Sequence, residues 1–105
     1  DQYDLIILDP PAFAKHKKVL NNALQGYRKL NAKAFEKIRP GGILFTFSCS
    51  QVVSKENFRL AVFSAAAQSG RNVRILHQLT QPADHPVNIY HPEGEYLKGL
   101  VLYVE

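Results

Sequence analysis

The sequence predicts an α/β protein with a largely parallel sheet. Short apolar runs alternate with longer segments in which apolar residues recur at three- and four-residue spacing, which indicates strands separated by helices. Strands that are joined by helical crossovers run parallel, and such crossovers are right-handed. With 105 residues, of which 46% are hydrophobic and 21% charged, the chain has the size and composition of one compact domain at most.

The first strand is expected at residues 5–8, where Leu-Ile-Ile-Leu forms an apolar run typical of a strand buried on both faces. A long helix should follow over residues 17–38, because apolar side chains recur along one helical stripe. The stripe consists of Leu20, Leu24, Tyr27, Leu30 or Asn31, Ala34 and Ile38. The sequence Arg-Pro-Gly-Gly at residues 39–42 is expected to end this helix.

The second strand is expected at residues 43–47, which are again apolar on both faces. Ser54 is a good N-cap for the helix that follows, since its hydroxyl can accept from a backbone N–H of the first turn. Gly70 should end that helix in a left-handed conformation. Alternating apolar residues predict a third strand at 72–79, and a polar connection rich in proline and glycine leads to a last strand at 99–104.

The connection between the last two strands has no helical pattern, so these strands are expected to form an antiparallel hairpin at one edge of the sheet. A parallel sheet with one reversed strand near its end is the second half of the class I methyltransferase fold. The first four residues lead into a strand without linker, start signal or cap. We therefore expect residues 1–105 to be a piece of a longer protein.

Polar residues follow the first two strands. Asp9 lies at the carboxyl end of the first strand, where open α/β sheets bind ligands because helices cover both faces. Pro10 and Pro11 have a fixed φ and no N–H, and Pro10 keeps Asp9 extended. A stiff loop of carbonyl acceptors, with the ring of Phe13 behind it, suits a flat heteroaromatic base. Asp-Pro alone usually only ends a strand, but here Ser-Cys-Ser at residues 48–50 ends the next one.

Basic residues are concentrated in one segment. The net charge is +4, and eight basic residues lie between positions 15 and 39 against a single acid, Glu36. They are Lys15, Lys17, Lys18, Arg28, Lys29, Lys33, Lys37 and Arg39. RNA would suit this segment as a polyanionic partner, and a solvated helix face accounts for the charge equally well.

Two further properties restrict the class of protein. No apolar stretch approaches the roughly 20 residues of a membrane span, and no charged-then-apolar signal opens the chain, so a soluble protein without a membrane partner is expected. Cys49 is the only cysteine, so an intrachain disulfide is impossible and a cytoplasmic protein is expected. Structural zinc sites need several converging ligands, so no metal site is expected either.

Four motifs resemble those of a known family. They are Asp-Pro-Pro-Ala-Phe at residues 9–13, Thr-Phe-Ser-Cys-Ser at 46–50, Ala-Asp-His-Pro at 83–86 and Pro-Glu-Gly-Glu-Tyr-Leu-Lys-Gly at 92–99. In this order and spacing they look like the carboxyl-terminal part of the bacterial 23S ribosomal RNA cytosine-5 methyltransferases that carry an amino-terminal PUA domain. Asp-Pro-Pro is shared with adenine-amino and guanine methyltransferases, whereas Ser-Cys-Ser points to carbon 5 of cytosine.

The resemblance implies roles for individual residues. Cys49 would be the nucleophile that adds to carbon 6 of cytosine and thereby activates carbon 5 for methylation. Asp9 would stabilise the charge that appears at ring nitrogen 3. Phe13 would stack on the flipped base, and the carbonyls of Pro10 and Pro11 would accept hydrogen bonds from its exocyclic amine.

The resemblance also implies S-adenosylmethionine as methyl donor and ribosomal RNA as substrate. Asp9 and Pro10 would border the donor methyl group, and Lys15 would contact the RNA. His85 lies in a loop expected to fold over the same edge, where it would contact the base, help to remove the carbon-5 proton or make a structural hydrogen bond. No Gly-x-Gly-x-x-Gly motif or close variant is present, so residues 1–105 are expected to be a partial catalytic domain that lacks the cofactor-binding half.

Two other functions remain open from the sequence. One is a methyltransferase that acts on a base nitrogen, with Cys49 incidental, since a lone cysteine is commonly a small buried apolar residue. The other is a non-catalytic RNA-binding module.

The fragment alone is expected to be inactive. Its strand at residues 5–8 contains no proline or charge, so an exposed edge there should pair with another chain, and we expect a two-fold dimer.

Overall fold

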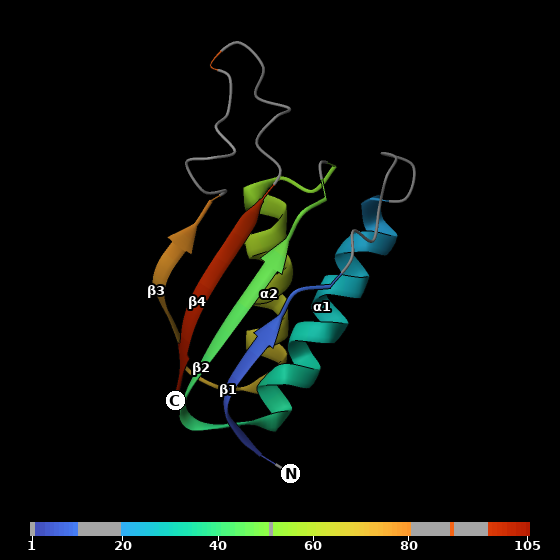
Figure 1. The fold of residues 1–105 in the computed structure, drawn as a ribbon. Coiled ribbons are helices and arrows are strands. Elements are labelled where there is room, and N and C mark those ends of the chain that lie inside the picture. Colours follow the sequence, from blue (N-terminus) through green and yellow to red (C-terminus); the bar gives the residue numbers. More distant parts are fainter. Residues whose placement is uncertain (1, 11–19, 51, 81–88, 90–96) are drawn as a thin grey trace.

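The strands and helices follow one another in the predicted order (Figure 1). The computed structural model describes residues 2–10, 20–50, 52–80, 89 and 97–105. The elements are β1 (Tyr3–Leu8), α1 (Leu20–Lys37), β2 (Ile38–Ser48), α2 (Lys55–Ser69), β3 (Val73–Leu79) and β4 (Lys98–Val104). Over these described ranges, neither helix has the length and apolarity needed to cross a membrane.

The strands form one mixed sheet in the order β1-β2-β4-β3. β1 and β2 are parallel, with Leu8 opposite Thr46. β4 lies between β2 and β3 and is antiparallel to both. The predicted α/β class, the parallel first strands and the antiparallel pair near one edge are therefore confirmed. The sequence pattern did not indicate that β4, the last strand, lies inside the sheet and leaves β3 at the edge.

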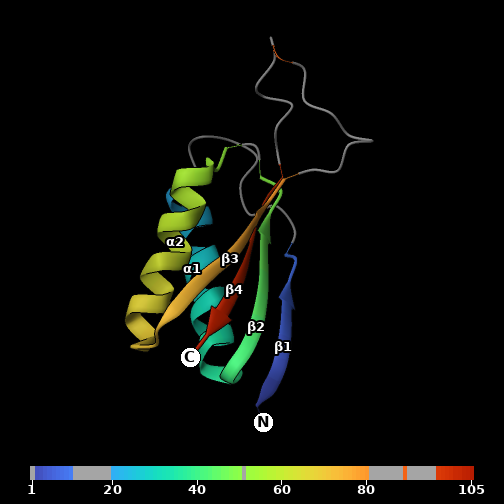
Figure 2. The same ribbon diagram turned by 90° about the vertical axis from the view of Figure 1, so that its left-hand side faces the viewer.

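Both helices pack on the same face of the sheet (Figure 2). The core between helices and sheet consists of side chains from α1 and α2 and from alternate positions of β2 and β4. Its largest fully buried members include Tyr27, Phe35, Phe58, Ile38, Leu44 and Leu102. The rings of Tyr27 and Phe58 meet edge to face with centroids 5.5 Å apart, which joins α1 to α2 within the core.

No described element covers the opposite face of the sheet. On β1, Tyr3, Leu5 and Ile7 are 51, 54 and 62% exposed. Ile6 and Leu8 point to the other side and pack against the core. The expectation that this strand is buried on both faces is therefore wrong for the described structure, because both helices cover one face and β1 is an edge strand.

The junction between α1 and β2 also differs from the prediction. Residues 39–42 were expected to separate helix from strand, but they belong to β2, which begins at Ile38 directly after the helix. β1 pairs first with Ile38 and then with Ile43, so residues 39–42 form an irregularity in the register. Gly41 has a φ of +86°, which glycine adopts without strain, and a Cβ on Gly42 would lie 2.6 Å from the Ile38 side chain. The two glycines therefore permit an irregular strand instead of a loop.

Arg71 closes the carboxyl end of α1. Its Nη1 donates to the carbonyls of Phe35 and Ile38 at 2.8 and 2.5 Å, and its Nε donates to the carbonyl of Glu105 at 3.1 Å. The last carbonyls of a helix lack intrahelical partners and carry partial negative charge, so a cation there is stabilising. Local sequence does not predict this contact, because Arg71 lies 33 residues from Ile38 along the chain.

The ends of α2 are confirmed as predicted. The Ser54 hydroxyl accepts a hydrogen bond from the Asn57 N–H at 3.0 Å, and this caps the amino end. Gly70 has a φ of 72° and terminates the helix in the left-handed conformation. These two residues act on backbone groups a few positions away, which is why sequence alone identifies them.

The buried stripe of α1 follows the predicted one at Tyr27, Asn31 and Ala34 and also includes Ala23 and Phe35. The buried residues are Ala23, Tyr27, Asn31, Ala34 and Phe35, whereas Leu20, Leu24 and Leu30 are half-buried. Asn31 is tolerated there because its amide nitrogen donates to the carbonyl of Tyr27 at 2.8 Å. A hydrogen bond within the helix therefore allows a polar side chain at a core position.

Candidate active site

The carboxyl ends of β1 and β2 lie side by side at one edge of the sheet (Figure 1). Leu8 pairs with Thr46, so the chain leaves β1 at Asp9 and leaves β2 slightly later at Cys49. Because neighbouring strands are about 4.8 Å apart, both residues belong to the same edge. Asp9 is exposed and Cys49 is half-buried. The structure thus brings together the two residues predicted to be catalytic, where open α/β sheets bind ligands.

Pro10 is the one other predicted site residue within the described part of the chain. It is half-buried and follows Asp9 directly. The predicted site residues that lie outside the described residues are Pro11, Phe13, Lys15 and His85. The motif at residues 83–86 lies outside them too, and the motif at 92–99 is described only from residue 97 onwards. Their roles in contacting a base or RNA stay predictions.

The serines on both sides of Cys49 are buried. Ser48 and Ser50 are 0 and 1% exposed, whereas Cys49 between them is half-buried. We name these three residues the Cys49 triplet. The same alternation runs through β2, where Thr46 is buried and Phe47 half-buried, because successive side chains of an extended chain point to opposite faces. The spacing of two between these hydroxyl residues is the sequence signal that could have identified the buried side of the triplet.

Hydrogen bonds hold the buried side of the triplet. The Ser48 hydroxyl donates to the Tyr27 hydroxyl at 2.9 Å, and the Ser50 N–H donates to the Ser48 oxygen at 3.3 Å. The Ser50 carbonyl accepts from Lys98 Nζ at 2.5 Å and from the Val53 N–H at 3.4 Å. The two serines therefore anchor the loop, a role that the motif itself does not predict.

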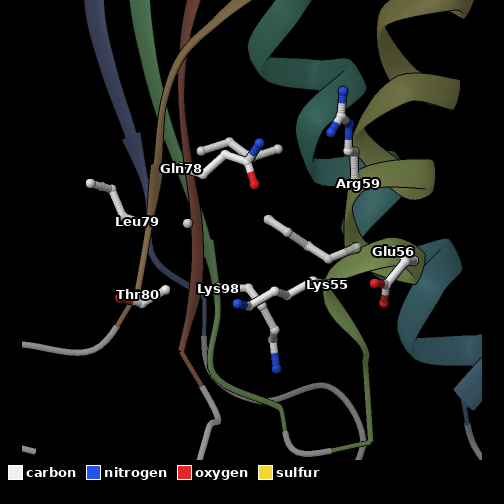
Figure 3. Close-up of a pocket in the computed structure, with 10 residues that line it drawn as sticks. Lys55, Glu56, Arg59, Gln78, Leu79, Thr80 and Lys98 are labelled. Atoms are coloured by element: carbon white, nitrogen blue, oxygen red, sulfur yellow. The ribbon is translucent and has the colours of Figure 1, made fainter. Parts of the chain in front are cut away.

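A small pocket lies next to the triplet, between the start of α2 and the neighbouring ends of β3 and β4 (Figure 3). Its volume is about 160 Å³. Its lining includes the basic residues Lys55, Arg59 and Lys98, the acid Glu56 and the apolar residues Phe58 and Leu100. Asp9 and Cys49 do not line it, so it is separate from the edge that those two residues share.

An open apolar groove runs along the free side of β1. It has a volume of about 390 Å³ and is lined by Tyr3 and residues 5–8 of β1 and by Leu30, Lys33, Ala34 and Lys37 of α1. β1 pairs with β2 on one side only, and no described strand lies on the other. An unpaired apolar edge is where another strand can add to a sheet.

Three lysines form an exposed row on α1. Lys29, Lys33 and Lys37 are spaced four residues apart, which places them on one face of the helix, and all are exposed. The described arginines of the basic segment are engaged elsewhere. Arg28 donates to Gln25 and Gln68, and Arg39 lies 3.6 Å from Asp4. The lysine row is therefore the described part of the basic segment most available to a polyanion.

Comparison with curated proteins finds similarity over nearly the whole chain. The chain is 48% identical over 102 residues to the ribosomal RNA large subunit methyltransferase I of Tolumonas auensis. It is 46% identical over 102 residues to that of Aeromonas hydrophila. Both alignments cover 97% of this chain and 26% of the relative, so the chain spans about a quarter of the length of these relatives. No family model matches it.

Two solved structures share the fold. SMU.776, described as a methyltransferase and complexed with SAH, matches with a TM-score of 0.80 at 24% identity, over 97% of this chain and 26% of that one. A protein from Streptococcus mutans, described as SAM-dependent, matches with a TM-score of 0.79 at 20% identity, over 97 and 25% of the two chains. This chain therefore has the fold of one part of a class I methyltransferase, and its sequence is similar over 97% of its length to about a quarter of a ribosomal RNA large subunit methyltransferase.

Proposed function

We propose that this chain is the base-handling part of a methyltransferase that modifies carbon 5 of a cytosine in ribosomal RNA. The observation that carries the proposal is the placement of Asp9 and Cys49 at the ends of adjacent parallel strands. The triplet keeps its serines buried and leaves the thiol partly accessible, as a nucleophile requires. A cysteine that served only in packing would be buried. The substrate class is supported by the names of the relatives.

The proposed chemistry begins with covalent addition. The Cys49 thiolate forms a bond to carbon 6 of cytosine, and the electron pair of the 5,6 double bond moves towards carbon 5 and the rest of the ring. Carbon 5 then bonds to the donor methyl group while the bond between that methyl and the donor sulfur breaks. Loss of the carbon-5 proton to a base and elimination of the thiolate restore the aromatic ring, which leaves Cys49 free for another turnover. His85 is a candidate for that base.

Asp9 is proposed to stabilise the ring during addition. Negative charge appears at ring nitrogen 3 when the thiolate adds, and a carboxyl group beside that nitrogen stabilises it through a hydrogen bond. Asp9 is exposed at the shared edge and has no ion-pair partner among the described residues. The carbonyls of Pro10 and Pro11 are proposed to accept from the exocyclic amine, with Phe13 stacked on the base.

S-adenosylmethionine, when bound, supplies the methyl group. Asp9 and Pro10 are proposed to border that methyl, because they lie at the carboxyl edge beside the free side of β1. The residues described there fit only this small part of the cofactor. Pro10 has no N–H to donate, and the neighbouring groove is largely apolar. We therefore expect this chain alone to bind the cofactor weakly and to be inactive by itself.

Ribosomal RNA is the proposed partner, and the cytoplasm is the proposed location, because a protein that modifies ribosomal RNA has to meet its substrate there. The lysine row on α1, which is part of the basic segment at residues 15–39, provides charge for phosphate contacts. We also propose that residues 1–105, without the rest of a longer protein, form a two-fold dimer through β1. The support for the dimer is the exposure of Leu5 and Ile7 above 50% on a strand with a free edge.

The direct test of the proposed chemistry is Cys49→Ala in the full-length protein. We expect methylation to fall by at least about 10³-fold, because the variant cannot form the covalent bond, while RNA affinity stays within about twofold. RNA containing 5-fluorocytosine should trap an adduct with the unmodified protein and none with the variant, since fluorine cannot leave as the proton does. A Cys49→Ala protein that methylates at the normal rate would favour a nitrogen-directed enzyme. RNA binding with no methylation by either protein would favour a binding module.

A further inference from the structure

A buried lysine lies next to the Cys49 triplet. Lys98 is the first residue of β4 and pairs with Ser48 across the antiparallel ladder. It is 5% exposed. Figure 3 shows its side chain leaving β4 and running towards the loop that follows β2. There its ammonium donates to the Ser50 carbonyl at 2.5 Å. A lysine that merely began a strand would keep its ammonium in water.

The placement of this ammonium needs a physical reason, because taking a charge out of water is costly. Lys55, on α2 in the same pocket, is exposed, whereas Lys98 is 5% exposed. Part of the cost for Lys98 is offset by a charge-assisted hydrogen bond, which is stronger than one between neutral groups. Its acceptor belongs to the residue directly after Cys49.

The bond from Lys98 completes the fixation of Ser50. The N–H of Ser50 is held by the Ser48 hydroxyl, which in turn is held by Tyr27, and its carbonyl is held by Lys98 and more weakly by Val53. Both peptide groups that follow Cys49 are thus tied to the buried side of the loop. Covalent addition requires the thiol within about 3–3.5 Å of its target atom, so a fixed backbone directly after the cysteine favours the reaction.

We propose that Lys98 is a positioning residue for Cys49. Its ammonium fixes the Ser50 carbonyl, and this orients the loop so that the thiol stays at the edge shared with Asp9. The fixing of the loop is a property of the described chain itself. Its consequence for turnover rests on the proposed function, in which Cys49 is the nucleophile.

Hydrogen exchange in this chain tests the fixing of the loop without any activity. Lys98→Met removes the ammonium but keeps an unbranched side chain, Lys98→Arg keeps a cationic donor, and Lys33→Met is a control on the exposed row of α1. We expect Lys98→Met to speed exchange of the segment 48–53 at least tenfold relative to the rest of the chain. Lys98→Arg should stay within threefold of the natural chain, and the control should leave the segment unchanged.

Three results would overturn the proposal. They are unchanged exchange at residues 48–53 in Lys98→Met, faster exchange spread evenly over the whole chain, or no recovery with arginine. If Lys98→Met does not fold, Lys98→Gln, which keeps a neutral donor, takes its place in the comparison with Lys98→Arg.

Turnover in the full-length protein tests the consequence. We expect Lys98→Met to lower kcat at least tenfold with KM for RNA within twofold, and Lys98→Arg to recover most of the loss. A rise in KM at constant kcat would assign Lys98 to RNA binding and overturn the positioning role. Failure of the proposed function is separate from this, because it shows as normal methylation by Cys49→Ala whatever the exchange of the loop.

Discussion

The neighbouring strands β1 and β2 end at the same edge of the sheet but are held in different ways. β2 has a strand on each side, and the triplet at its end is tied to α1 and β4 through Tyr27 and Lys98. Among the described strands β1 has a partner on one side only, and its Leu5 and Ile7 are more than half exposed. The thiol is therefore carried by the fixed strand. The carboxyl group of Asp9 is carried by the strand that has no described strand on its other side and borders the apolar groove.

The largest difference between the two regions should appear in stability. Phe58→Ala removes a ring that is 1% exposed in the core, and we expect it to cost about 3–5 kcal/mol of the free energy of unfolding. Ile7→Ala removes a side chain that is 62% exposed, and we expect it to cost less than about 0.5 kcal/mol. Urea unfolding at low protein concentration measures both. Similar losses for the two variants would mean that β1 is covered in solution.

The next test concerns the free edge of β1. Ile7→Lys places a charge on the exposed apolar face, and we expect it to weaken self-association of this chain at least tenfold, since charged side chains on an edge strand oppose pairing. Leu60→Lys on α2 is the matched control, because Leu60 is 60% exposed but lies away from the sheet edge. Sedimentation equilibrium distinguishes the cases. A monomeric natural chain, or equal effects of both variants, would contradict a dimer through β1.

A smaller effect is expected on the fixed side, at the hydroxyl of Tyr27. Tyr27→Phe leaves the buried Ser48 hydroxyl without its acceptor, and we expect a loss of about 1–2 kcal/mol in the free energy of unfolding. Tyr103→Phe serves as control, since Tyr103 is half-buried on the other face of the sheet. Guanidinium unfolding of the two variants gives the comparison. An unchanged stability in Tyr27→Phe would mean that water replaces the tyrosine hydroxyl.

The smallest effect should come from a single surface charge beside the open groove. Lys33→Gln in the full-length protein should reduce the slope of log affinity for RNA against log salt by about 0.7–0.9 if Lys33 contacts one phosphate. Glu36→Gln on the same helix is the control, because it changes charge without removing a cation. Filter binding at several salt concentrations measures the slope. A slope equal to that of the unchanged protein would return the lysine row to an ordinary solvated helix face.

The features that were predictable from sequence depend on short-range effects or on the order of strands and helices. Ser54 and Gly70 mark the ends of α2 because they act on nearby backbone groups. Asp9 and Cys49 could be placed at one edge because parallel strands have their carboxyl ends on the same side. Given the order of strands and helices, topology brings these two residues together even though 40 positions separate them in the printed sequence.

The features that were not predictable depend on contacts between distant segments. Lys98 stands directly before the predicted last strand at residues 99–104, and only the pairing of β4 with β2 brings it to Ser50. Arg71 caps a helix that ended more than 30 residues earlier. Residues 39–42 carry strong signals for a turn, yet β1 and β4 draw the surrounding chain into a strand. Contacts between distant segments decide all three features, and around residues 39–42 strand pairing overrides the local preference for a turn.

The interior position of β4 determines when the sheet can close during synthesis. Among the described strands β4 comes last along the chain, yet it separates β2 from β3, so the facing edges of these two strands stay unpaired until residues 98–104 have been made. Pairings between segments so far apart in sequence form slowly, and open edges invite association in the meantime. Lys98 arrives with the same strand. The loop that carries Cys49 is therefore fixed in the same step in which β4 pairs with β2 and β3. A nascent chain that stops before β4 would have neither the complete sheet nor the fixed loop.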